Sequence, residues 1–508
     1  KTTTITTSKQ QQQQQHSLMT SFKYLVGILL LSSLLVLPAF ASEDQHMEEP
    51  QLELTEQPDF DASDDNDAPN EPEVVEVEYE QPSGDKRSLA TYPGLRIYVD
   101  YEHVTNGEGT QAFKDYIIKH LGPSVANYFQ AALKVKHPLK TKITSTKSTL
   151  CGFSTPKILK NGGVDADVFI FLNSRNAQDK NWIAITTLCT VAASNGITKP
   201  QIFNIGINEK WMDVASAAEN PLTHDLNINT LMHEFIHGFA MSGSLYKYFV
   251  DDNDKPLVGH VKELDLNGEV RTVLDLPPLT KRLRTFYGCD TAPGIIMEND
   301  GGAHLERRYY QYEIMSSGGI IGSRITEISL GFLEGTGWYV PDYCFAEPYT
   351  FGQGQGCEFI FNDCDPKKFE EFCSGDSKGC NIFGESGANC KSDSKSESCK
   401  FNMGNSAFNC ENPKGIYYTT LSTKQVYGRG LGSKCFAGNL TSSKTGNPSP
   451  NAYCFTYKCL GKGADTTLRV NFGTETFDCT KKGLATVKGY YGFVTCPDPI
   501  EFCATIGK

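Results

Sequence analysis

The residues His233-Glu234-Phe235-Ile236-His237 form an H-E-x-x-H motif within residues 227–241, where apolar side chains recur at helical spacing. Side chains four residues apart lie on one face of a helix, so both imidazoles can bind the same metal ion. Zinc lowers the pKa of a bound water to about 7, and Glu234 is placed to take a proton from that water. The motif therefore predicts metal-assisted hydrolysis, although such a motif also occurs in helices that only happen to contain two histidines. Asn229 or Thr230 is expected to cap the start of this helix.

A catalytic zinc site needs a third protein ligand and one open position. Gly243 stands where the compact form of the motif has its third histidine, six residues after His237. The chain offers His224, His260 and His304 nearby. We expect His224 to precede the helix, and His260 to be a solvated loop residue because its surroundings are rich in Asp and Lys. On the residues alone, the third ligand stays open.

A methionine turn lies shortly after His304, because Met315 follows it by eleven residues within a small-residue stretch. Here the sequence resembles the leishmanolysin family, the surface metalloproteases of trypanosomatids and their relatives. In these metzincins an insertion separates H-E-x-x-H from the third histidine, and a methionine turn follows. The corresponding insertion here has 66 residues, 238–303. The stretches 286–289 and 352–357 also match that family, and the resemblance runs from about Leu95 to the end of the chain.

The resemblance implies one zinc ion per chain and a fold for the chain. It implies zinc ligands at His233, His237 and His304, a general base at Glu234, and Met315 packed under the metal. The implied fold class is α+β: a metzincin-type zinc protease catalytic domain with an inserted central region, followed by a disulfide-rich, mostly irregular or β C-terminal domain. One departure is Ala240, at a position where the family usually has glycine. Alanine tolerates positive φ poorly, so we expect the helix to continue and the chain to turn at Gly243.

Fourteen of the 17 cysteines lie between Cys344 and Cys503, and no C-x-x-C motif occurs. This distribution fits a disulfide scaffold better than a zinc ribbon or a redox motif. The odd total leaves at least one cysteine without a partner in the chain. By resemblance, Cys151 pairs with Cys189 and Cys289 pairs with Cys344, and the remaining cysteines form six bridges with one left over.

The amino-terminal region predicts secretion. Residues 1–18 are interpreted as a leader or an uninformative extension, and 19–41 as a signal peptide with a leucine-rich core that is cut after Ala41. The alternative is an uncut signal anchor that keeps the protein at the membrane. The carboxyl end shows no GPI signal, and no second long apolar run follows, so we expect no permanent membrane span after cleavage.

Residues 42–87 form an acidic, proline-punctuated stretch that we expect to be a disordered propeptide. Of the 60 acidic residues, 17 lie between Glu43 and Asp85, so the net charge of −13 belongs to this segment and the rest of the chain is nearly neutral. The stretch ends in Lys86-Arg87, a candidate processing site. It contains no cysteine that could bind the zinc. We therefore expect the acids to maintain latency until cleavage after Arg87; the alternative is that they only assist solubility.

The remaining chain is expected to fold as an amino-terminal catalytic domain (88–241), a central domain with the third ligand and the methionine turn (242–343), and a cysteine-rich C-terminal domain (344–508). Strands are predicted at 95–99, 168–172 and 201–205, and a helix near 113–133.

The sequence thus predicts a secreted zinc endopeptidase that acts on proteins or peptides. The alternative is a catalytically inactive, metalloprotease-like adhesion or binding protein that works through its cysteine-rich region. No basic stripe points to nucleic acid. Asn439 begins the one glycosylation sequon after the signal peptide.

Overall fold

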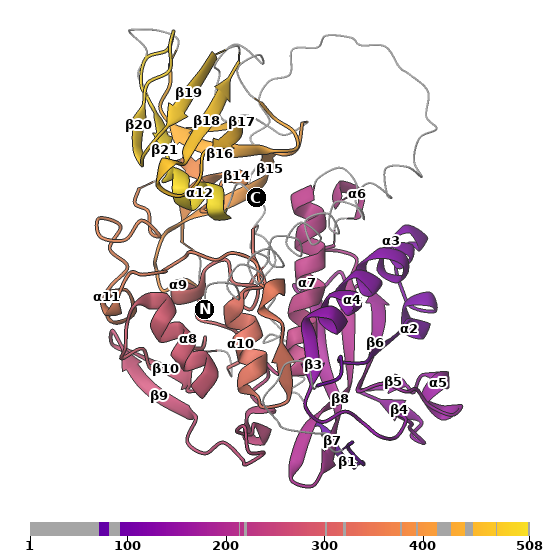
Figure 1. Ribbon diagram of the computed structural model, residues 1–508. Coiled ribbons are helices and arrows are strands. Elements are labelled where there is room, and N and C mark those ends of the chain that lie inside the picture. Colours follow the sequence, from indigo (N-terminus) through magenta and orange to yellow (C-terminus); the bar gives the residue numbers. More distant parts are fainter. Residues whose placement is uncertain are drawn as a thin grey trace, which may run out of the picture.

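The structure is a computed structural model that describes residues 71–80, 92–212, 214–217, 221–299, 302–318, 322–375, 378–392, 395–413, 428–441, 451–473 and 475–505. The expected leader, signal peptide and Lys86-Arg87 site lie outside these residues. Helices and strands are mixed, and the C-terminal region is rich in β-structure (Figure 1). The coarse fold class expected from the sequence is therefore confirmed.

The main sheet has five strands in the spatial order β1-β7-β8-β6-β2. Their bounds are Glu73–Glu76 for β1, Ala184–Ser194 for β7, Ile197–Asn208 for β8, Val168–Arg175 for β6 and Ile97–Asp100 for β2. β8, β6 and β2 are parallel, whereas β7 is antiparallel to β8, and β1 is parallel to β7. β6 is buried along almost its whole length, as expected for a parallel strand covered on both faces.

Two long helical segments cover one face of this sheet. The first is continuous through α3 (Gln111–Tyr116), the π-turn η3 (Ile117–Leu121) and α4 (Gly122–Ala132), and the second is α7 (Pro221–Phe239). The ring of Phe129 in α4 packs 5.8 Å from Phe235 and 5.1 Å from Phe239 in α7. A Cβ at Gly238 would lie 2.4 Å from the Phe203 ring of β8, so only glycine lets α7 approach the sheet this closely.

The other elements of the first two thirds of the chain are short. They are α2 (Glu102–Thr105), β3 (Leu133–Val135), β4 (Thr149–Leu150), β5 (Phe153–Ser154), α5 (Lys157–Lys160), α6 (Val214–Ala217), η4 (Tyr246–Tyr248), β9 (Val261–Leu266), β10 (Glu269–Leu274), α8 (Pro277–Tyr287), β11 (Ile295–Ile296), α9 (Arg307–Tyr310), α10 (Glu327–Gly335), β12 (Tyr339–Pro341) and η5 (Tyr343–Phe345).

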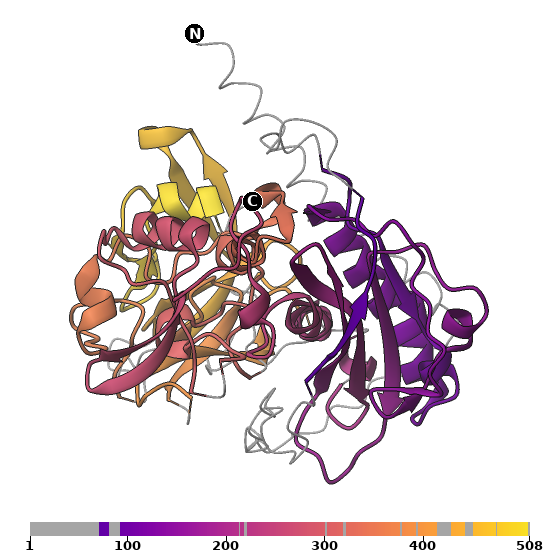
Figure 2. The same cartoon turned by 90° about the horizontal axis from the view of Figure 1, so that it is seen from below.

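The C-terminal region contains a three-stranded and a six-stranded antiparallel sheet. Its elements are α11 (Cys357–Phe361), β13 (Lys378–Cys380), β14 (Ser386–Lys391), β15 (Phe401–Asn409), β16 (Ser433–Gly438), β17 (Asn451–Leu460), η6 (Gly463–Asp465), β18 (Thr467–Phe472), β19 (Glu475–Cys479), β20 (Gly483–Ala485), β21 (Val494–Cys496) and α12 (Pro499–Thr505). Figure 2 shows the main sheet with its helices on one side of the molecule and the later segments on the other.

The hydrophobic cores divide the chain differently from the boundaries expected at 241 and 343. One continuous core extends from Tyr79 to Phe401 and includes Phe359 and Phe372. A second core, made only of residues between Phe436 and Phe502, lies in the six-stranded sheet. The first part of the cysteine-rich region therefore packs as part of the body that carries α7.

Residues 71–80 are ordered, although they lie inside the stretch expected to be disordered. β1 pairs with residues 190–193 of β7, and Tyr79 is buried, with its hydroxyl 2.7 Å from the carbonyl oxygen of Ala192. The expectation of disorder is wrong for these ten residues. Apolar and acidic side chains alternate from Val75 to Glu80, so this part has one apolar face that the acidic average composition does not reveal.

Eight disulfides account for 16 of the 17 cysteines. They join 151–189, 289–357, 364–399, 373–390, 380–435, 410–454, 459–503 and 479–496. Cys151–Cys189 has the partners that the family resemblance implies. The implied bond between Cys289 and Cys344 is wrong, because Cys289 pairs with Cys357 and Cys344 is free.

The number of free thiols in two cysteine variants distinguishes the Cys289–Cys357 bond from the Cys289–Cys344 bond. In the observed pairing, Cys344→Ser leaves no thiol, whereas Cys357→Ser leaves two, at Cys289 and Cys344. We therefore expect zero and two labelled thiols per chain, respectively, when the secreted variants are denatured and treated with a maleimide. The reverse counts would show that Cys289 is bonded to Cys344.

Half-buried Asn439 lies at the end of β16, and its side-chain oxygen accepts a hydrogen bond of 2.8 Å from the backbone of Phe493. Its use as a glycosylation site stays a prediction. Among the described residues, no helix combines the length and the apolar character that a membrane crossing requires.

Candidate metal centre

Helix α7 carries the H-E-x-x-H motif, but its ends differ from those expected. It begins at Pro221, so Asn229 and Thr230 lie inside it: the Asn229 amide donates to the Ser323 carbonyl at 2.6 Å, and Thr230 does not cap the start. It ends at Phe239, and none of residues 240–243 adopts a positive φ. The expected continuation to Gly243 is therefore wrong.

The Nε2 atoms of three histidines converge on one point. Those of His233 and His237 lie 2.8 Å apart, and each lies 3.2 Å from Nε2 of His304. His233 and His304 are buried, and His237 is half-buried. The fold thus brings His304, which lies 67 residues after His237, to the two histidines of the motif helix. Within the described residues, this is the one group of three or more His, Cys, Asp or Glu side chains close enough to hold a metal ion.

The hydrogen bonds of two of these rings orient their free nitrogens toward the shared point. Nδ1 of His233 lies 2.6 Å from the Ile314 carbonyl oxygen, and Nδ1 of His237 lies 2.7 Å from that of Met241. Because a carbonyl only accepts, each Nδ1 carries the proton and each Nε2 presents a lone pair. Burial lowers the pKa of His233 well below its usual value, which favours the neutral ring. Lone pairs this close repel unless a cation lies between them, so the donor set fits a metal ion, and three imidazoles are a zinc-type set.

The two other candidate histidines are not in this cluster. His224 lies inside α7, where its Nδ1 is 3.1 Å from the Tyr116 hydroxyl. His260 is 7% exposed, and its Nε2 lies 3.1 Å from the Tyr246 carbonyl oxygen. The expectation that His260 is a solvated loop residue is wrong, because a polar sequence neighbourhood does not reveal which side chain turns inward.

Glu234 is buried beside the histidines and held by a residue that the sequence did not indicate. The hydroxyl of Thr186, in β7, donates to Oε2 of Glu234 at 2.7 Å. Burial raises the pKa of Glu234 to about 7, and the hydrogen bond from Thr186 acts in the opposite direction. A carboxylate with such a pKa can take up and release a proton near neutral pH.

The methionine turn lies against the third histidine, because the backbone N–H of Leu305 donates to the Met315 carbonyl at 2.9 Å. Met315 is fully buried, and its own N–H donates to Oε2 of Glu313 at 2.7 Å. Glu313 is also buried and accepts hydrogen bonds from the hydroxyls of Thr326 and Ser329. The sequence did not indicate Glu313, which holds the turn through these hydrogen bonds.

Comparison with known proteins agrees with this geometry. The profile of the Peptidase M8 family, described as Leishmanolysin, matches residues 107–396, a range that contains the three histidines and the methionine turn. The chain belongs to the leishmanolysin family.

Several curated proteins of this kind are similar to the chain. Ciliated left-right organizer metallopeptidase of Mus musculus is 28% identical over 306 residues, which are 54% of this chain and 43% of that protein. Leishmanolysin of Leishmania major is 25% identical over 262 residues, 50% of this chain and 41% of that protein. Leishmanolysin-like peptidase of Caenorhabditis briggsae is 28% identical over 370 residues, 56% of this chain and 54% of that protein. The chain therefore spans about half the length of the curated relatives it matches.

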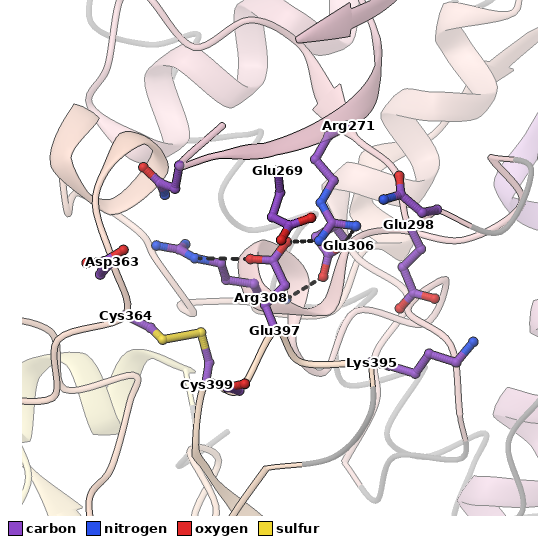
Figure 3. A pocket seen from close by; sticks show the side chains of 13 residues that line it. Glu269, Arg271, Glu298, Glu306, Arg308, Asp363, Cys364, Lys395, Glu397 and Cys399 are labelled. Atoms are coloured by element: carbon purple, nitrogen blue, oxygen red, sulfur yellow. Dashed lines mark hydrogen bonds and ion pairs between the residues drawn. A yellow bond between two sulfur atoms is a disulfide. The ribbon is translucent and has the colours of Figure 1, made fainter. Parts of the chain in front are cut away.

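A charged cavity of about 480 Å³ is lined by side chains that include Arg271, Glu306 and Glu397 (Figure 3). Arg271 of β10 is its central cation, with Nη1 3.0 Å from Oε2 of Glu306, and it also pairs with Glu397. Arg308 lies 3.8 Å from Glu397. Glu306 is two residues from His304 and is 1% exposed, and burial raises its pKa to about 8. The cysteine-rich loop that carries Glu397 is thus tied to the segment that presents the third histidine.

Arg271→Met is expected to lower the free energy of unfolding by about 3–5 kcal/mol, because it removes the cation of buried Glu306 and leaves Glu397 with Arg308 alone. Arg469→Met is the matched control: its pair with Asp478 is exposed, so we expect a loss below about 1 kcal/mol. Denaturant unfolding of the two variants checks this. Equal losses would mean that the buried network does not stabilise the fold.

Proposed function

We propose that this chain is a zinc-dependent endopeptidase that hydrolyses peptide bonds in proteins, with a metzincin-type catalytic domain and an inserted central region. The observation that carries the proposal is the convergence of three Nε2 atoms beside a buried glutamate. In this proposal His233, His237 and His304 hold one zinc ion. A bound zinc ion supplies Lewis acidity and lowers the pKa of water.

Glu234 acts as the general base and then as the general acid. The hydroxyl of Thr186 donates a hydrogen bond to Oε2 of this carboxylate, which leaves Oε1 to take the proton of the attacking water. The same oxygen then gives the proton to the leaving amine. Thr186 keeps the carboxylate in one orientation, so the proton is accepted and released at the same place.

The proposal includes a place of action and a class of substrate. Eight disulfides are typical of proteins from the secretory pathway, which supports secretion. Family membership supports protein or peptide substrates. The cut after Arg87 and the latency of the uncut chain remain part of this proposal.

Gelatin zymography of the secreted protein tests the proposed function. We expect a clear band that disappears with a zinc chelator and returns when zinc is added back. The Glu234→Gln variant, run in the next lane, controls for a contaminating protease. A metal-loaded protein that clears no gelatin would contradict the proposal and favour the inactive binding protein.

A further inference from the structure

The outer edge of β7 carries an acidic strand from the segment that we expect to be removed. We propose that this edge is a docking surface for an extended acidic peptide, that residues 71–80 of the chain are its occupant, and that their docking keeps the metal centre latent. The part on latency rests on the proposed peptidase function. The part on docking does not.

Backbone hydrogen bonds hold the segment along two neighbouring stretches of chain. Residues 73–76 pair with residues 190–193 of β7, and the N–H of Val77 donates to the Ala193 carbonyl at 2.9 Å. Farther along, the segment pairs with residues 138–140, where the Lys140 N–H donates to the Glu78 carbonyl at 2.9 Å. Backbone hydrogen bonds therefore hold the segment from residue 73 to residue 80, and residues 73–76 form a strand of the main sheet.

Tyr79 anchors the segment in an aromatic and cationic socket. Its side chain is 7% exposed, its hydroxyl donates to the Ala192 carbonyl at 2.7 Å, and its ring lies 6.0 Å from that of His137. The ammonium of Lys199 lies 5.3 Å from the ring centre. Lys199 is 1% exposed, and its ammonium has no hydrogen-bond partner among the described residues. Attraction to the carboxylate of Asp167 and the face of the tyrosine ring compensate for this buried charge.

Three lysines select an acidic strand. Exposed ion pairs add little to stability, but complementary charge favours the matching partner over others. The pairs are Glu71–Lys247 at 2.7 Å, Glu78–Lys140 at 3.0 Å, and Glu73–Lys147. These three glutamates belong to the acidic stretch whose charge dominates the sequence.

Two short chains of contacts connect the docked segment to the metal centre. Glu71, at its amino-terminal end, pairs with Lys247 in η4, where the hydroxyl of Tyr246 donates to the carbonyl of Gly302, two residues before His304. In β7, the partner of Glu73 is four residues from Thr186, which binds Glu234.

An extended peptide substrate can gain affinity by adding a strand to an exposed sheet edge. The edge of β7 has one free row of backbone groups and can pair with only one such strand at a time. β1 occupies that row at residues 190–193 of β7 in the uncut chain. A substrate strand that extends along β7 from Thr186 past residue 190 therefore has to displace the segment.

The test uses the full chain with residues 84–87 replaced by the recognition sequence of a site-specific protease. After the cut and a high-salt wash, a fluorescent peptide with the sequence of residues 71–80 is titrated into the protein, and anisotropy reports its binding. Hydrolysis of a quenched fluorescent peptide is followed in parallel. We expect the uncut chain to be at least about tenfold less active than the cut and washed chain, and the added peptide to restore the low activity.

Peptide variants separate the parts of the surface. The peptide with Glu71→Lys, Glu73→Lys and Glu78→Lys is expected to bind about tenfold more weakly, and the Tyr79→Ala peptide at least as weakly. The control peptide, Glu76→Gln with Glu80→Gln, also loses charge, but at glutamates for which the described residues include no lysine partner. Its binding should change by less than about twofold.

Two results would overturn the proposal. Equal binding of the native, charge-reversed and Tyr79→Ala peptides would show that the edge of β7 is not a docking surface for this sequence. Tight binding of the native peptide with unchanged hydrolysis would show that docking of residues 71–80 does not keep the metal centre latent. If no form of the protein hydrolyses a peptide, the proposed function fails, and the anisotropy titration still decides whether the docking surface exists.

Discussion

Glu234→Gln is expected to lower kcat/KM for peptide hydrolysis by about 10²–10⁴-fold while zinc stays bound. Glutamine has nearly the same shape and its amide oxygen can accept the hydrogen bond from Thr186, but it cannot take a proton from water. Metal analysis and steady-state kinetics of the same preparation measure both quantities. The expected result is one zinc per chain with almost no turnover.

Glu263→Gln is a matched control for this variant, because Glu263 is an exposed glutamate in β9 outside the metal centre. Its turnover should equal that of the native protein. Near-normal hydrolysis by Glu234→Gln would remove Glu234 from the mechanism. Loss of zinc from that variant would mean that the carboxylate supports metal binding.

His304→Ala is expected to remove both zinc and activity. It deletes one of three converging nitrogens and leaves two that lie 2.8 Å apart. The loss in zinc affinity should exceed the ~10–100-fold that removal of an outer partner of a ligand typically costs. Competition with a zinc-binding dye measures this affinity without relying on activity.

His260→Ala controls for the loss of a buried imidazole elsewhere. His260 is 7% exposed and lies outside the cluster, so its removal should leave zinc content at one per chain. If His304→Ala kept full zinc affinity, the third ligand would have to be another residue.

The chemistry of the site could be predicted from the sequence because the motif is local. Two histidines and a glutamate within five residues of a helix need no long-range information. The third histidine became predictable only through the family resemblance, since 66 residues separate it from the second. The strands at 168–172 and 201–205 were predictable because buried parallel strands are nearly continuous apolar runs.

Other features depend on contacts that a linear pattern does not contain. β7 mixes threonine with apolar residues and has a register shift near Cys189, so no clean alternation marked it, and Thr186 was missed with it. The partner of Cys289 is decided by the loop before Cys357, whose Gly354 and Gly356 N–H groups donate to carbonyls at the end of α8. Such long-range backbone pairing leaves no trace in cysteine spacing.

Zinc K-edge X-ray absorption of the secreted, purified protein tests the central claim most directly. That claim is that His233, His237 and His304 together hold one zinc ion. The account predicts stoichiometric zinc with three imidazole nitrogens at about 2.0–2.1 Å and no sulfur ligand. A zinc–sulfur distance of about 2.3 Å, or a protein that takes up no zinc, would contradict it.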